Sequence, residues 1–242
     1  FIYGDFDLVS QFIEDGQGLK EWLEDQGAVF NDGLQNTLIG ALWHRENVQM
    51  GGDFDGDGEV DEGMNGNWGV YFETTKRTLM DASADNQIMT RTKAESLIVE
   101  DGKVTGVNAT MYDGTKVTVH ANKGVIMATG GYAANISMII ETNQYWDPSY
   151  VTDATKTTNR SSQVGDGIVM GEAAGASTTG LGWAQMMPIS WIDNGNLAFG
   201  SGANCIYINP TTGKRFVNET SERDVLSLGE FKNGVAVNGT QG

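Results

Sequence analysis

Apolar side chains recur at helical spacing over residues 7–26, and Gly27 follows at a position that suits a helix C-terminus. This pattern indicates two short helices that face a core. Residues 73–85 show the same period, so they predict a further helix with Leu79 and Met80 turned inward.

The period then changes to two. Apolar and polar residues alternate over four segments, which are 88–93, 94–100, 103–112 and 115–121. Asp101-Gly102 and Asp113-Gly114 are strong signals for two-residue hairpin turns. Residues 88–121 therefore predict an antiparallel β-meander, and with the helices they indicate an α+β fold.

A short apolar run, Gly124–Gly131, ends in small residues and is typical of a buried strand that meets a ligand at its end. Helices are expected at 135–142 and 168–174. The second follows Gly165-Asp-Gly167, where free backbone N–H groups and a carboxylate suit a hydroxylated or phosphorylated ligand. Asp166 is equally consistent with a helix N-cap.

Residues 205–227 predict a short strand, a tight turn closed by proline and glycine, and a helix that begins near Glu222 with Ser221 as N-cap. Arg223 then lies in the first turn of that helix, where the helix dipole disfavours a cation. We expect compensation by Asp224, by Glu219 or by an anionic ligand. An ion pair on the helix surface is the alternative to a functional role.

An acidic loop begins at Asp53 and follows the opening of an EF-hand calcium loop. The twelfth position of that motif would be Met64 in place of a bidentate glutamate, so the match is incomplete. The candidate ligands of a structural Ca²⁺ are Asp53, Asp55, Asp57 and Asp61. A solvated acidic loop without a metal is the alternative.

The composition narrows the function classes. With 15 Lys and Arg against 32 Asp and Glu, the net charge of −17 argues against nucleic acid or an anionic membrane as partner. No apolar run reaches membrane-spanning length. Of the two histidines, His44 lies in a mixed segment, 31–48, that favours loop and helix, and His120 lies in the meander. A Ser-His-Asp hydrolase or a multi-histidine metal enzyme is therefore disfavoured.

Three blocks together resemble the fumarate reductase and succinate dehydrogenase flavoproteins, nearest the flavocytochrome c and urocanate reductase branch. The blocks are Gly124–Tyr132 with Asn135, Gly165–Ile168 with Gly175-Ala176, and Asn209–Ser227. The resemblance implies an FAD-binding oxidoreductase fold with a mixed α/β capping domain. It also implies a G-x-G-x-x-G unit and a C-terminal block that this sequence lacks, so we expect a fragment of a longer protein that binds FAD poorly or not at all by itself.

The resemblance also implies residue roles. Arg223 falls on the catalytic arginine, which would give a proton to the carbon beside the one that receives a hydride from reduced FAD. The expected cofactor contacts are Ala94, Glu95, Ala128, Thr129, Gly130, Gly131 and Asp166. The implied domains are a partial FAD-binding domain at 1–132, a capping domain at 133–228 and a polar tail at 229–242.

Departures from the family pattern bear on the substrate. Met187 stands where dicarboxylate reducers carry a histidine, and Ala198 and Ser201 stand at the places of their relay Glu and Arg. With Trp183 nearby, this favours an aryl acrylate or urocanate-like acid over fumarate. An electron-donor protein or domain is implied as partner, and the compartment is open.

Two alternative functions are compatible with the sequence. One is a related FAD flavoprotein of the ketosteroid dehydrogenase or amino-acid oxidase type, which the Ser221–Asp224 block disfavours. The other is an acidic Ca²⁺-binding module without catalysis.

Overall fold

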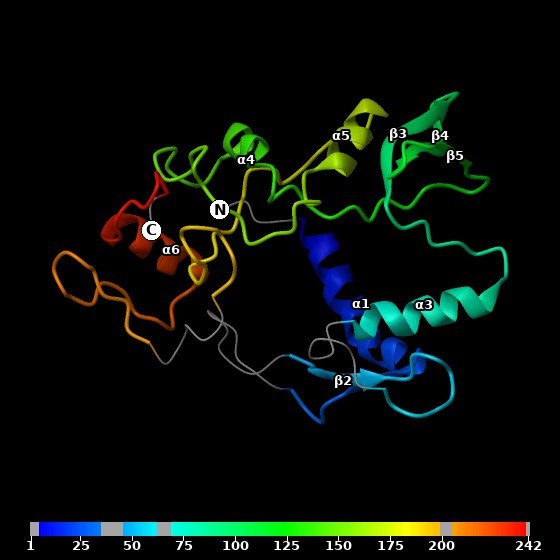
Figure 1. The fold of residues 1–242 in the computed structure, drawn as a ribbon, viewed down its shortest axis with the longest axis horizontal. Helices are drawn as coiled ribbons and strands as arrows, with labels where there is room; N and C mark the ends of the chain where they lie inside the picture. The colour runs from blue at the N-terminus through cyan, green and yellow to red at the C-terminus, as the bar shows by residue number, and fades with distance from the viewer. Residues whose placement is uncertain (1–4, 35–45, 62–68, 199–204, 241–242) are drawn as a thin grey trace. The chain divides into compact units, whose positions relative to one another are not determined.

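The computed structural model describes residues 5–34, 46–61, 69–198 and 205–240. Internal contacts divide the chain into two units, Phe1–Met89 and Thr90–Gly242 (Figure 1). The helix expected within 31–48, and His44 with it, lie largely outside the described residues. The boundary between the contact units lies at 89/90, and the division into a cofactor domain and a capping domain at 132/133 stays a prediction.

The first unit opens with one long helix, α1 (Phe6–Asp25), where the sequence indicated two short ones. The Asp5 side chain caps it by accepting from the N–H groups of Asp7 and Leu8 at 3.0 and 3.2 Å. Two glycines at 16 and 18 weaken such a helix by about 1 kcal/mol each relative to alanine, which does not interrupt it here. Gly27 follows with φ +100°, the left-handed conformation expected after a helix end.

Two short strands and a second helix complete this unit. Strand β1 (Ala28–Phe30) pairs antiparallel with β2 (Gln49–Gly52), and α3 (Val70–Ala82) packs on them. The prediction that Leu79 and Met80 face inward is wrong, because they are 45% and 40% exposed. The buried residues of α3 lie one turn apart near its start, at Val70 and Thr74, where the helix meets the strands.

The second unit begins with the predicted meander, in the order β3 (Thr92–Glu100), β4 (Lys103–Met111) and β5 (Lys116–His120) (Figure 1). Residues 88–90, expected to be a strand, are irregular. Asp101 and Gly102 both have positive φ, 49° and 74°, as a two-residue type I′ turn requires. The second turn is longer than predicted, because the N–H of Met111 donates to Thr115 O across three residues.

The run Gly124–Gly131 is not a strand. Within the described residues it has no strand to pair with, and Ile126 is 95% exposed. The predicted helix after it is present as α4 (Ile136–Thr142), capped by the Asn135 side chain. A core of Ile139, Trp146 and Val151 lies beside it.

Two further helices carry the motifs of interest. Helix α5 (Asp166–Ala173) has Gly165 as N-cap in the left-handed conformation, so the prediction of Asp166 as N-cap is wrong. Helix α6 (Arg223–Asn233) has Glu222 as N-cap instead of Ser221. It continues five residues past Leu228, into the segment expected to be a polar tail. The strand expected at 205–208 is reduced to one bridge, Ile208 with Arg215.

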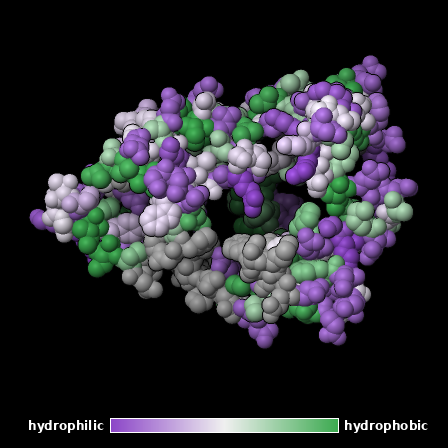
Figure 2. Space-filling view, viewed as in Figure 1, coloured by the Kyte–Doolittle hydropathy of each residue, from purple (hydrophilic) through white to green (hydrophobic). Residues whose placement is uncertain are grey.

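Apolar side chains are plentiful at the surface, and Figure 2 shows them as green patches among hydrophilic residues. Tyr112 is 85% exposed, Phe6 81% and Phe12 79%. The cores of both units are correspondingly small. The mixture of helices with small antiparallel sheets confirms the α+β fold class. Among the described helices, none is both long enough and apolar enough to cross a membrane.

Candidate functional site

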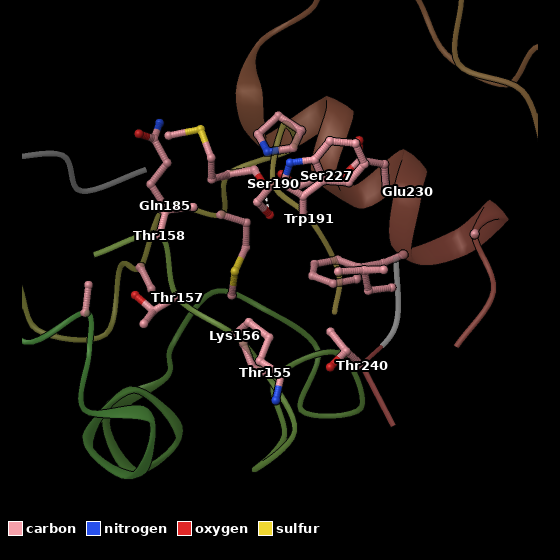
Figure 3. Close-up of a pocket in the computed structure, with 18 of the residues that line it drawn as sticks. Thr155, Lys156, Thr157, Thr158, Gln185, Ser190, Trp191, Ser227, Glu230 and Thr240 are labelled. Carbon is pink, nitrogen blue, oxygen red and sulfur yellow. Dashed lines mark hydrogen bonds between the residues drawn. The ribbon is translucent and has the colours of Figure 1, made fainter. Parts of the chain in front are cut away.

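A cavity of about 700 Å³ lies within the second unit. Its walls come from the segments around α4, the loop 155–159, the segment 183–192, residues 207–216 and the inner face of α6. Figure 3 shows α6 on one side of it and Thr155–Thr158 on the other. Both predicted substrate residues, Trp183 and Met187, line this cavity. Its volume is in the range usual for small-molecule sites.

Arg223 is the first residue of α6, and its guanidinium reaches the rim of the cavity through Gln185. Its Nη1 donates to Gln185 Oε1 at 3.1 Å, and Gln185 is a lining residue. Gln185 is neutral, so the charge of Arg223 is not balanced by this contact. Among the described residues no carboxylate forms an ion pair with Arg223.

The carboxylates expected to compensate Arg223 are engaged elsewhere. Buried Glu219 accepts two hydrogen bonds from Arg215 and one, of 3.0 Å, from the N–H of Tyr207. The bond from Arg215, then that from Tyr207, lower the pKa of Glu219 to about 2. Asp224 accepts from the hydroxyl of Tyr145 at 2.9 Å. Glu219 therefore does not compensate Arg223. Asp224 lies beside Arg223 in the first turn of α6 but forms no ion pair with it, so an anionic ligand is a further candidate.

The inner face of α6 adds two polar side chains that the sequence analysis did not single out. Ser227 and Glu230 both line the cavity (Figure 3). Burial raises the pKa of Glu230 to about 8. They follow Arg223 at i+4 and i+7, the spacing of one helix face. Glu230 was missed because residues 229–242 were expected to be a polar tail.

The predicted cofactor contacts gather at the start of α5. Asp166 pairs with Lys93 of β3 at 3.4 Å, which holds α5 beside the strand that carries Ala94 and Glu95. Glu95 is itself paired with Lys116 at 3.0 Å. Hydrogen bonds from Thr110 and then Lys116 lower its pKa.

Residues 128–131 lie against the same helix. A Cβ on Gly167 would stand 1.9 Å from Thr129 Oγ1, so only glycine permits this contact. The N–H of Gly131 donates to the Gln163 side-chain oxygen at 3.1 Å, while a Cβ on Gly131 would meet nothing within 4 Å. Ala128, Thr129, Gly130 and Gly131 are all exposed. The contact of this accessible, glycine-rich backbone with FAD stays a prediction.

The acidic loop lies in the first unit. Carboxylate oxygens of Asp53, Asp55 and Asp57 lie within 4.8 Å of one another. Asp53 also pairs with Arg77 at 2.8 Å, and Asp61 accepts from the N–H of Phe54 at 3.1 Å. The Ca²⁺ site stays a prediction, which calorimetric titration with Ca²⁺ tests, because no heat of binding would contradict it.

Comparisons with known proteins bear on the whole chain. The family described as FAD binding domain matches residues 3–241. The chain is 36% identical over 239 residues to the NADH:acrylate oxidoreductase of Vibrio harveyi, covering 96% of this chain and 22% of that protein. It is 29% identical over 232 residues to the urocanate reductase of Eggerthella lenta, covering 93% and 34%.

A solved structure agrees. The open conformation of a flavocytochrome c3 fumarate reductase matches with a TM-score of 0.62 and 27% identity, covering 88% of this chain and 34% of that one. The chain thus spans between a fifth and about a third of the length of these relatives. The resemblance inferred from three sequence blocks is confirmed. The chain belongs to the FAD binding domain family, with the fumarate reductase-like flavoproteins as its relatives.

Proposed function

We propose that the protein containing this chain is a flavin-dependent reductase of the C=C bond of an unsaturated carboxylate. One observation carries the proposal. Arg223 stands at the unfavourable end of the α6 dipole, beside a largely apolar cavity, and its guanidinium donates to a neutral glutamine. A substrate carboxylate would supply the ion-pair partner that Arg223 does not have among the described residues.

Arg223 would act in two ways. Its planar fork can hold the carboxylate by two hydrogen bonds, with Gln185 keeping the guanidinium in place. It would also give a proton to the α-carbon when a hydride reaches the β-carbon. Arginine stays protonated far above neutral pH, so it donates only to a strongly basic carbanion and must then be reprotonated.

The cofactor would be held partly by this chain. Ala128–Gly131 and Asp166 would contact FAD, and Ala94 and Glu95 would lie toward its adenine end. Bound FAD in its reduced form supplies the hydride. An electron-donor protein or domain would restore that form. The chain's own contribution is to position the substrate and to supply the proton.

The substrate we propose is an aryl acrylate or a urocanate-like acid. Trp183 and Met187 give the cavity apolar walls suited to a planar tail, and the volume exceeds what a four-carbon acid needs. Two of the relatives are named for acrylate and urocanate. Turnover of fumarate by the whole protein at rates matching aryl acrylates would contradict this assignment.

The catalytic role of Arg223 is tested in the whole flavin-loaded protein. Arg223→Gln should lower kcat for cinnamate by about 10²–10⁴-fold, the usual contribution of a positioned proton donor. Lys232→Gln changes an exposed cation of the same helix and should leave kcat unchanged. Flavin absorbance and thermal unfolding must match in all three proteins. Full activity of Arg223→Gln would remove Arg223 from the mechanism.

A further inference from the structure

The face of α6 that begins with Arg223 continues into the cavity. Ser227 and Glu230 lie about 6 and 10 Å further along the helix axis, by the rise of 1.5 Å per residue. All three side chains share one face, because i+4 and i+7 return to the same side of a helix. The cavity therefore extends from Gln185, the partner of Arg223, to Ser227 and Glu230 (Figure 3).

The far end of this cavity holds polar atoms without partners. Ser227 is 2% exposed, and its Oγ is buried with no hydrogen bond. The hydroxyl of Tyr207, which lines the same cavity, is also buried with no hydrogen bond. No hydrogen bond or ion pair of the Glu230 carboxyl is found among the described residues. Buried polar groups are nearly always paired, so the two buried hydroxyls beside the half-buried Glu230 carboxyl indicate a missing partner.

The pKa shifts of Tyr207 and Glu230 bear on the charge of that partner. Burial, followed by the nearby charge of Glu230, raises the pKa of Tyr207 to about 12. Burial also keeps Glu230 largely protonated at neutral pH. Glu219, whose charge is balanced by Arg215, lies near Tyr207, and Lys156 lies on the loop across the cavity. Burial therefore disfavours a charged ligand group at this end, an anion included.

A neutral hydroxyl suits the three groups best. A protonated carboxyl donates one hydrogen bond and accepts another, and each hydroxyl does both, so they match a ligand group that also donates and accepts. An ammonium ion would need Glu230 to ionise in a desolvated position, which is costly.

We propose that Tyr207, Ser227 and Glu230 form a subsite for a neutral hydroxyl group on the tail of the unsaturated acid whose carboxylate faces Arg223. This inference rests on the proposed function, because the carboxylate end is defined by Arg223. The substrate class would then be an aryl acrylate with a hydroxyl at the end of the ring away from the acrylate.

The test compares cinnamate with 4-hydroxycinnamate in the whole flavin-loaded protein. The wild type should show a KM about tenfold lower for the hydroxylated acid, the size of one or two hydrogen bonds. Ser227→Ala and Glu230→Leu should abolish that preference, and Glu230→Gln should retain part of it. Ser137→Ala, an exposed serine of α4 outside the cavity lining, is the matched control. Equal KM values in the wild type would overturn the subsite.

A second measurement separates the subsite from the proposed function. Calorimetry with p-cresol and toluene probes the tail without any carboxylate or turnover. Tighter binding of p-cresol that is lost in Ser227→Ala supports the subsite even if neither acid is reduced, in which case the proposed function fails alone. Equal binding of both probes in the wild type overturns the subsite whatever the activity.

Discussion

Arg223 Nη1 lies 3.1 Å from Oε1 of Gln185, a residue 38 positions earlier in the chain. This bond joins the start of α6 to the segment that carries Trp183 and Met187. The contact orients the guanidinium without pairing it with a carboxylate. We expect Gln185 to act as a positioning residue for Arg223.

Gln185→Ala should lower kcat for an aryl acrylate by about tenfold, the value of one hydrogen bond to a charged group, with a smaller change in KM. Steady-state kinetics of the whole protein measures both parameters. Gln144→Ala is a control, since this exposed glutamine donates to Leu181 O and lies outside the cavity lining. Equal kcat in wild type and Gln185→Ala would show that Arg223 needs no such support.

Glu230 should make the folded state less stable as the pH rises into the alkaline range. Its folded pKa, about 8, is above the ordinary value of 4.5, so the folded state binds the extra proton. The contribution is fully present below about pH 4.5 and is lost as the pH rises through 8. The glutamine of Glu230→Gln stays neutral at pH 9. At that pH its free energy of unfolding should exceed that of the wild type by about 1–3 kcal/mol, and its melting temperature should be higher. An equal difference in melting temperature between Glu230→Gln and the wild type at pH 5 and at pH 9 would contradict this.

Glu219 should make the folded state less stable as the pH falls. The bonds from Arg215 and from the Tyr207 N–H hold its folded pKa near 2, below the ordinary 4.5. Its contribution is present above pH 4.5 and is lost as the pH falls toward 2. Glu219→Gln should therefore lower the melting temperature at pH 7 and narrow the gap to the wild type at pH 3. A gap of constant size between these pH values would show that Glu219 is not ionised in the fold.

Two glycines of α5 provide a matched pair for the expected cofactor edge. Gly167→Ala should displace Thr129, since the new Cβ would lie 1.9 Å from its Oγ1, and cost about 1–3 kcal/mol. Gly171→Ala meets only the Ala176 Cβ at 3.7 Å and should stabilise the helix by about 0.5–1 kcal/mol. Flavin content after purification should fall in the first variant alone. Unchanged flavin content in Gly167→Ala would show that the position of Thr129 does not matter for FAD binding.

Several elements follow from local patterns, because the forces that form them act between near neighbours. The meander follows from alternation with period two and from Asp101-Gly102, whose positive φ angles favour one hairpin. Helices α4 and α6 were predicted within one or two residues at their starts. The place of Arg223 in a first helical turn needed nothing beyond these rules.

Other features depended on tertiary packing. The Gly124–Gly131 run is apolar enough for a strand, but a strand also needs a hydrogen-bonding neighbour, and the described chain has none for it. Local patterns also did not predict that Glu222 caps α6 or that Phe6–Asp25 forms a single helix.

The amino-acid sequence by itself determined the family, the meander and Arg223 as the residue to follow, because motifs and turn chemistry are local. Only the tertiary structure decided that Gln185 accepts from Arg223 and that the N–H of Tyr207 donates to Glu219. It also brought Tyr207 into one cavity with Ser227 and Glu230. These contacts join segments up to 38 residues apart, and such contacts form only when the local elements pack against one another.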